Sequence, residues 1–185
     1  MRSLPHKKKK GPRTEAQYAN EQKFKFVAEW LIPFYPFVTI GFQNQAVNNT
    51  EINAAFSVNY KNATVGSYPA LSINYNEVKL SEGSLAKLVG LELTLLYNNT
   101  IQLTWLRNNI DHPCSYNDQL MLVLYNEELK ITDGFIGGID RADQQCTYTI
   151  NLKLIGKPLH VYVVMYAVGG KKVSQTQYLG KVDGL

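Results

Sequence analysis

Alternating apolar and polar residues dominate the chain after residue 70, and a period of two is typical of half-buried β-strands. The alternation is clearest in residues 71–75, 91–95 and 101–105. A turn is expected at Asn98 and Asn99, because asparagine tolerates a positive φ. The pattern therefore predicts strands on both sides of that turn.

The other β signals are apolar runs separated by turn residues. Residues 120–125 are apolar throughout, as in a strand buried on both faces. Further strands are expected at residues 129–132, 148–154, 159–168 and 173–179. Glycine and aspartate are frequent in residues 133–145, which predicts a loop. Seven or eight short strands without a helical pattern among them predict an antiparallel β-sandwich.

Before residue 67 the apolar period is helical. Thr14 and Gln17 have the spacing of a capping box, and the helix that they start is expected to reach residue 32, where a proline follows. A second helix is expected to begin after the cap residue Thr50 and to end near residue 63. Residues 33–43 are aromatic and contain two prolines, which predicts an irregular packed connector. The fold class is thus mainly β with N-terminal helices.

Charge divides the chain further. Residues 1–25 carry eight basic and two acidic side chains, a net charge of +6, whereas the other 160 residues carry 11 basic and 13 acidic ones, a net charge of −2. Together with the periodicity, this predicts three parts. They are a basic N-terminal arm (1–13), a helical segment (14–66) and a β-sandwich domain (67–185).

The arm is the first candidate binding site. Its basic residues are Arg2, Lys7, Lys8, Lys9, Lys10 and Arg13. Such a block could neutralise phosphates of nucleic acid or the charges of another polyanion, with an affinity that falls steeply with salt. Two alternatives are an arm that docks on a neighbouring protein subunit and a solvated tail that contacts nothing.

Aromatic side chains form the second candidate. Trp30, Phe34, Tyr35 and Phe37 lie close together in the sequence. Aromatic residues are favoured in the cores of protein interfaces, so these four are candidate interface residues. The alternative is that they pack the helical segment onto the sandwich.

Catalytic chemistry is not expected. Asp111, His112 and Cys114 are near neighbours, but adjacent residues rarely converge on one atom, and no zinc-ligand spacing accompanies them. Asp133 and Asp140 lie in a glycine-rich stretch that lacks the pattern of a calcium loop. We therefore predict no enzymatic activity, no cofactor and no metal. Whether Cys114 and Cys146 form a disulfide stays open.

Three segments resemble strands of a fibronectin type III module. IQLTWLRN (101–108) is similar to its tryptophan-bearing second strand, QLMLVLYNEE (119–128) to its third strand, and residues 160–180 to its last hairpin. The resemblance implies a fibronectin type III/immunoglobulin-like sandwich. It implies no activity, because that fold hosts many functions.

Motifs along the whole chain carry a second resemblance. They include Arg2-Ser3-x-Pro5, Arg13-Thr14-Glu15-Ala16-Gln17, Trp30-Leu31-x-Pro33, Gly66-x-Tyr68-Pro69, Ser81-Glu82-Gly83-Ser84-Leu85 and Tyr178-Leu179-Gly180. With them the chain resembles an uncharacterised domain-of-unknown-function family found mainly in Bacteroidota and their mobile elements. The resemblance implies no catalytic residues. Similar proteins usually carry a glycine-rich stretch before the first motif, whereas Met1 precedes it here, so a native and a shortened start both stay open.

These features predict a non-enzymatic structural or binding protein. Its basic arm is expected to engage an anionic polymer or a neighbouring subunit in a homo-oligomer or larger assembly, with phage-related assemblies as one setting. The alternative is an exported or cell-surface adhesion or carbohydrate-binding module. Because the chain shows no signal peptide and no transmembrane segment, a cytoplasmic or virion-associated location is expected.

Overall fold

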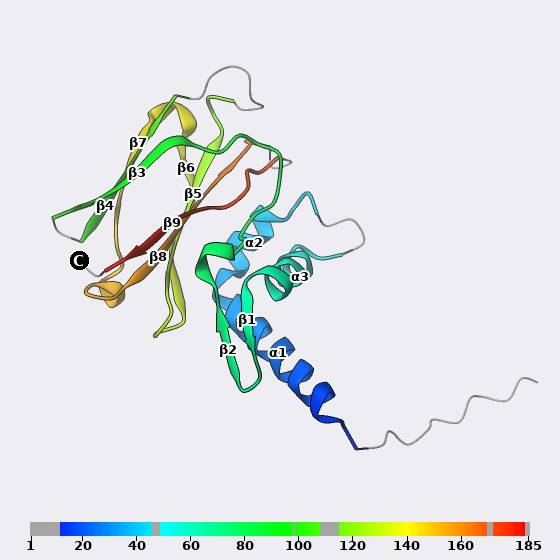
Figure 1. Ribbon diagram of the computed structural model, residues 1–185. Coiled ribbons are helices and arrows are strands. Elements are labelled where there is room, and N and C mark those ends of the chain that lie inside the picture. Colours follow the sequence, from blue (N-terminus) through cyan, green and yellow to red (C-terminus); the bar gives the residue numbers. More distant parts are fainter. Residues whose placement is uncertain (1–11, 46–48, 98, 108–114, 170–171, 184–185) are drawn as a thin grey trace, which may run out of the picture.

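The N-terminal layer is helical (Figure 1). The structure is a computed structural model that describes residues 12–45, 49–97, 99–107, 115–169 and 172–183. Helix α1 (Glu15–Leu31) begins with the predicted capping box, in which the Thr14 hydroxyl accepts the Gln17 N–H at 3.3 Å and the Thr14 N–H donates to Gln17 Oε1 at 3.1 Å. Helix α3 (Glu51–Asn62) begins after Thr50, also as predicted.

The connector between these helices is packed into the core, as predicted, but it is helical, so the predicted irregularity was wrong. A 3₁₀ turn (Ile32–Phe34) leads into helix α2 (Tyr35–Gly41). The proline of each element lies in its first turn, where a backbone N–H needs no acceptor within the helix. Two prolines therefore redirect the chain without ending its helical character.

A small hairpin lies beside the helices. Strands β1 (Thr64–Ser67) and β2 (Ala70–Ile73) pair antiparallel and form a separate two-stranded sheet. The strand predicted at residues 71–75 is thus confirmed in its first part, but it pairs with β1 and not within the sandwich. A 3₁₀ turn (Tyr75–Glu77) follows it. This hairpin crosses the expected limit between residues 66 and 67.

The described strands after residue 88 form two antiparallel sheets. Three strands follow the order β3 (Val89–Leu96), β4 (Thr100–Leu106) and β7 (Gln145–Thr149). Four strands follow the order β6 (Ile131–Asp140), β5 (Gln119–Asn126), β8 (Leu159–Tyr166) and β9 (Gln177–Val182). The mainly β, fibronectin-like sandwich is therefore confirmed. Trp105 lies on β4, the second strand of the sandwich along the chain, as the resemblance implied.

Strand β6 corrects the loop expected at residues 133–145. The chain stays extended to Asp140 and pairs with β5, and only then does a 3₁₀ turn (Arg141–Asp143) intervene. Glycine has a structural reason here. Gly134 has φ +128°, and a Cβ at this position would collide with the Leu122 carbonyl oxygen of the paired strand. Glycine thus permits a close strand contact and does not mark a loop.

Two later strands are shorter than predicted. The strand expected at residues 148–154 is β7, which ends at Thr149, and a 3₁₀ turn (Leu152–Leu154) follows. The strand expected at residues 173–179 begins only at Gln177, although Val173 forms an isolated bridge with Tyr166.

The four-stranded sheet is covered on both faces, which explains the continuous apolar run in β5. Leu120, Leu122 and Leu124 face the three-stranded sheet in one core cluster. Met121, Val123 and Tyr125 face the helices in a second cluster. The fold therefore has three layers, with the helical segment and hairpin on one face of the sandwich (Figure 1).

Candidate functional site

A cavity opens where the end of α1, the β1–β2 hairpin and the β5–β6 turn meet, and we call it the aromatic cavity. Its volume is about 380 Å³. Phe26, Glu29, Trp30, Ser72, Ile73, Tyr75, Tyr125, Glu127, Glu128 and Lys130 line it. The three α1 residues share one helix face because they are spaced by three and four positions. Segments far apart in the sequence thus build one hollow.

Aromatic rings form the inner wall of the aromatic cavity. The Trp30 ring lies 5.0 Å from the ring of Phe34, which lies 4.7 Å from that of Tyr125. The ring of Tyr75 lies 6.0 Å from that of Tyr125. Trp30 is 7% exposed, and its buried indole Nε1–H has no hydrogen-bond partner among the described residues. A buried N–H without an acceptor is uncommon. Because this atom is buried, it lies away from the open surface of the cavity.

His160 packs against Tyr75, one of the aromatic residues that line the cavity. Its ring stacks on that of Tyr75 at 3.7 Å, and its Nδ1 shares a 2.8 Å hydrogen bond with the Tyr178 hydroxyl. Burial lowers the pKa of His160 to about 4; Glu127 opposes this effect, and Lys181 adds to it. The imidazole is therefore neutral at pH 7 and acts as a packing element.

Carboxylates form the rim of the aromatic cavity. Glu127 accepts a hydrogen bond from Lys181 Nζ at 2.6 Å, and this bond lowers the pKa of Glu127. Glu128 and Glu29 lie 3.1 Å from Lys157 and 3.8 Å from Lys25. These lysines do not line the cavity, so its lining carries three carboxylates against the single ammonium of Lys130.

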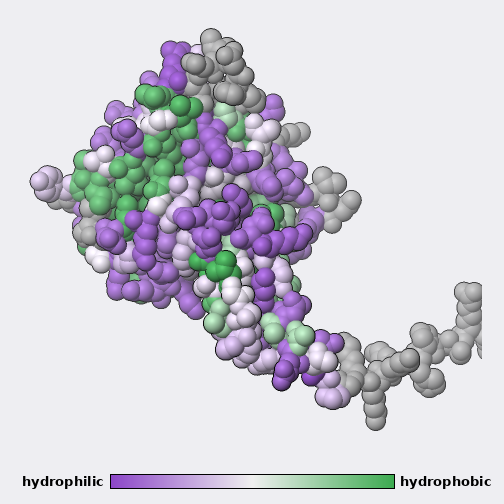
Figure 2. All heavy atoms as spheres, in the orientation of Figure 1, coloured by the Kyte–Doolittle hydropathy of each residue, from purple (hydrophilic) through white to green (hydrophobic). Residues whose placement is uncertain are grey.

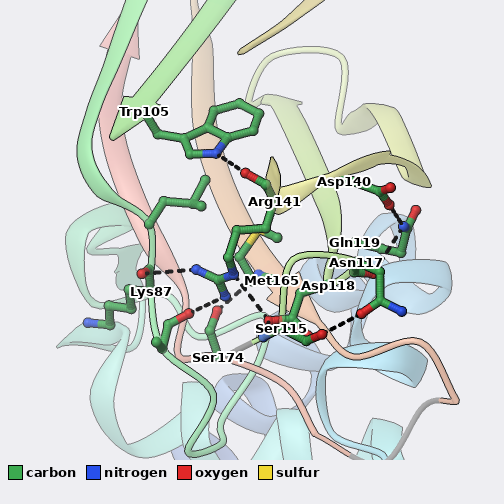
Figure 3. Close-up of polar contacts among 12 residues, drawn as sticks. Lys87, Trp105, Ser115, Asn117, Asp118, Gln119, Asp140, Arg141, Met165 and Ser174 are labelled. Atoms are coloured by element: carbon green, nitrogen blue, oxygen red, sulfur yellow. Dashed lines mark hydrogen bonds and ion pairs between the residues drawn. The ribbon is translucent and has the colours of Figure 1, made fainter. Parts of the chain in front are cut away.

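A buried ion pair lies at one end of the sandwich (Figure 3). Arg141 Nε contacts Asp118 Oδ2 at 3.1 Å, and their side chains are 4% and 1% exposed. The guanidinium also donates to the carbonyl oxygens of Ala86 (2.7 Å) and Lys87 (3.4 Å), while Trp105 Nε1 donates to the Arg141 carbonyl at 2.8 Å. The hydrogen bonds of the pair link β4, the start of β5 and the segment before β3. Because little of the pair reaches solvent, it offers no binding surface.

Most of the predicted arm residues lie outside the described residues. This holds for Arg2, Lys7, Lys8, Lys9 and Lys10. Arg13 is described, and its guanidinium contacts Glu21 at 2.8 Å on the surface of α1. The structure therefore places only the junction between the arm and the helix.

The predicted interface aromatics lie mainly in the core. Trp30, Phe34 and Phe37 are 7%, 0% and 7% exposed, and Tyr35 packs against the same cluster. They pack the helical layer onto β5 and β8, which is the alternative that the sequence offered. Of the four, Trp30 also lines the aromatic cavity.

The structure describes only some of the catalytic and metal candidates. His112 and Cys114 lie outside the described residues, and burial raises the pKa of the Cys146 thiol to about 11. Asp133 accepts hydrogen bonds from the Tyr148 hydroxyl and the Asn151 N–H, so its oxygens serve the local fold. Within the described ranges, no three His, Cys, Asp or Glu side chains are grouped as metal ligands.

Comparisons with known proteins identify a family but no activity. The sequence model of a family of unknown function, DUF6266, matches residues 1–180. The match says nothing about source organisms, so the expected distribution among Bacteroidota stays a prediction. No curated protein matches the chain. Among the described residues, no helix is both long and apolar enough to cross a membrane.

Proposed function

For this chain, which belongs to the DUF6266 family of unknown function, we propose a non-enzymatic binding or structural role. Its basic arm engages an anionic polymer or a neighbouring subunit in an assembly. The observation that carries this proposal is the separation of charge, since residues 1–13 hold six basic and no acidic side chains while the residues after 25 are net negative. Cationic termini of this kind bind acidic surfaces.

The position of α1 supports this role. Its N-terminal end projects from the body, so Arg13, where the arm meets the helix, lies at a distance from the sandwich (Figure 1). Arg13 and Glu21 form an ion pair there whose side chains are 67% and 48% exposed, and an exposed pair of this kind is worth little energy. The arm is thus attached at the capped end of a helix that is far from the sandwich. A cytoplasmic or virion-associated assembly, including one of phage origin, is the setting that we propose.

The alternative of a carbohydrate-binding module has less support. Such modules stack sugars on exposed aromatic platforms. The exposed aromatic residues described in the sandwich are Tyr97 and Tyr116, and these flank opposite ends of β4 and its following loop. The arm therefore remains the better-supported binding element.

Neutralising the arm tests the proposal. Sedimentation of the wild-type chain at low salt, alone and with a short DNA duplex, is expected to show self-association or DNA binding that disappears at high salt. Changing Lys7–Lys10 to Gln should abolish this association and leave the melting temperature unchanged.

The matched control changes four lysines of the described body, Lys23, Lys61, Lys153 and Lys172, to Gln. This control should retain the association of the wild-type chain. If the arm variant associates as strongly as the wild type does, the arm is not the binding element.

A further inference from the structure

We propose that strand β3 is an interaction surface and that it pairs, edge to edge, with β3 of a second copy of this chain. The contact is separate from the basic arm. Three features of β3 support it: a free backbone edge, apolar side chains along that edge, and a sequence that matches itself in an antiparallel pair. The resulting pair is weak and forms at high protein concentration.

The backbone of β3 is free on one side. Among the described residues, β4 is its only strand neighbour, so β3 is an edge of the three-stranded sheet. The chain just before β3 is tied to the start of β9, because Leu88 exchanges hydrogen bonds of 2.8 and 3.0 Å with the Gln177 side chain. After this link the two strands belong to different sheets. A free strand edge offers a row of N–H and C=O groups, and its natural complement is another strand.

Apolar side chains follow the free edge. Leu91 and Leu93 pack against the core of the sandwich but are only partly buried. Leu95 is 40% exposed, and the opposed pair Val89 and Leu106 is 50% and 61% exposed. Figure 2 shows the apolar surface that results, in green at the upper left over β3. Contiguous apolar surface of this kind marks interaction sites on soluble proteins.

The other sheet edges carry features that discourage pairing. β9 exposes Lys181, β6 contains three glycines with positive φ, and the exposed residues of β7 are glutamine and threonine. β3 has no lysine, arginine or proline, and five of its eight residues are leucine or valine. Its register against β4 shifts between Val89 and Glu92, but residues 92–96 pair regularly. Since lysine, proline and kinks are the usual protection of an edge strand, β3 is the least protected described edge.

The sequence of β3 matches a second copy of itself. In an antiparallel pair, directly opposite residues share one face of the sheet. With a two-fold axis at Thr94, Leu93 of one copy lies opposite Leu95 of the other, and the two Thr94 side chains meet. Glu92 is the only charged residue of the strand, and in this register it lies opposite Leu96. The two carboxylates therefore do not oppose each other, and the apolar faces of the two copies are continuous.

The size of this surface predicts a weak pair. Val89, Leu95 and Leu106 are about half exposed, and Tyr97, at the end of the strand, is 95% exposed. Together these side chains offer roughly 350 Å² per copy, if a fully exposed aromatic side chain offers about 200 Å² and an aliphatic one about 100 Å². Two copies thus bury roughly 700 Å² of side chain, besides backbone, which lies at the low end of interfaces. We expect a dissociation constant on the order of 100 µM, with single chains in dilute solution, where the arm is tested.

Sedimentation equilibrium of the full chain tests the pairing. The arm is neutralised by Lys7–Lys10→Gln and high salt is used, so arm contacts are absent. Between about 10 µM and 1 mM, the mass should rise from one chain toward two. Leu95→Lys in that chain adds an ammonium at the paired edge and should raise the dissociation constant at least tenfold. The control Leu129→Lys changes a leucine that is 44% exposed in the turn between β5 and β6, and should leave the constant unchanged.

Hydrogen exchange locates the contact without a substitution in the sandwich, so it remains decisive if Leu95→Lys fails to fold. The backbone amides of β3 should exchange more slowly at about 1 mM than at about 10 µM, because pairing protects them. The amides of β7, on the opposite edge of the same sheet, should exchange at the same rate at both concentrations.

Two results would overturn the pairing. The mass of one chain at every concentration would leave the β3 edge to a strand of a different protein. A dimer whose β3 amides gain no protection would place the contact elsewhere on the body. The proposed function of the arm fails on a different result, namely association of the arm variant in dilute solution at low salt, so the two proposals are tested separately.

Discussion

At pH 7 the imidazole of His160 is neutral, because burial lowers its pKa to about 4. Tyr75 stacks on the ring, Tyr178 hydrogen-bonds to it, and the charged groups Glu127 and Lys181 act on it from the adjacent turn and strand. In the unfolded chain a histidine has a pKa near 6.5. The folded state therefore binds fewer protons than the unfolded state between these two values.

The stability that neutral His160 contributes is complete above about pH 6.5 and is lost as the pH falls toward 4, by about 2 kcal/mol at pH 4.5. Urea unfolding at pH 7 and pH 4.5 measures this loss. His160→Gln, which retains a partner for Tyr178, should lose clearly less stability over the same interval. An identical loss in both proteins would show that other groups cause it.

A second prediction at the residue scale concerns the buried Arg141–Asp118 ion pair. Among the described residues, Arg141→Met leaves the buried Asp118 carboxylate with the Ser115 N–H but without its cation, so stability should fall by about 3–5 kcal/mol. Chemical unfolding measures this loss of stability. Lys153→Met, on the surface, serves as the control and should change stability by less than about 0.5 kcal/mol. A cost for Arg141→Met as small as that of the control would contradict this role for the pair.

At the scale of elements, Asn59 ties helix α3 to the segment that enters the sandwich. Its side chain is fully buried, donates to the Ala55 and Lys79 carbonyl oxygens at 2.8 Å each, and accepts the Lys79 N–H at 2.9 Å. Such a link fixes the chain between the hairpin and the first strand of the sandwich.

Removing that link should loosen the connection. Asn59→Ala leaves the Lys79 N–H and C=O without partners and is expected to lower stability by about 2 kcal/mol. Asn62→Ala, three residues later on the exposed side of α3, is the matched control. Thermal unfolding should give a lower melting temperature for Asn59→Ala than for Asn62→Ala. Equal melting temperatures would contradict the role of Asn59.

At the scale of the whole molecule, the helical layer and the sandwich share a core. Phe34 is fully buried and contacts the Tyr125 ring of β5, and Met121, Val123 and Val164 join the same cluster. Without the helices, one face of the four-stranded sheet would expose these apolar side chains. The two parts should therefore unfold together.

The two tryptophans can report on the two parts separately. Trp30→Phe leaves Trp105 in the sandwich as the fluorescent probe, whereas Trp105→Phe leaves Trp30 in the helical layer. Within each variant, the fluorescence midpoint in urea should coincide with the midpoint of circular dichroism. A separate earlier transition of Trp30 would show two independent units.

Local patterns predicted much of this fold. The Thr14–Gln17 cap and the alternation around Leu93 depend on neighbouring residues, so the sequence displays them directly. Pro36 and Gly134 were misjudged because their usual meaning as breakers depends on position: Pro36 lies in a first helical turn, and Gly134 lies beside a partner strand. The aromatic cavity had no local pattern, since long-range packing brings its segments together. Only the pair Glu127–Glu128 directly after a buried strand indicated acidic groups beside the core.

The most direct test of the central claim, that the basic arm is the binding element, is a light-scattering measurement at low and high salt, with and without a short DNA duplex. At low salt the wild-type chain should self-associate or bind the duplex, and at high salt it should do neither. The arm variant Lys7–Lys10→Gln should keep the mass of one 20.9 kDa chain under all of these conditions. Association of the arm variant as strong as that of the wild type would contradict the account.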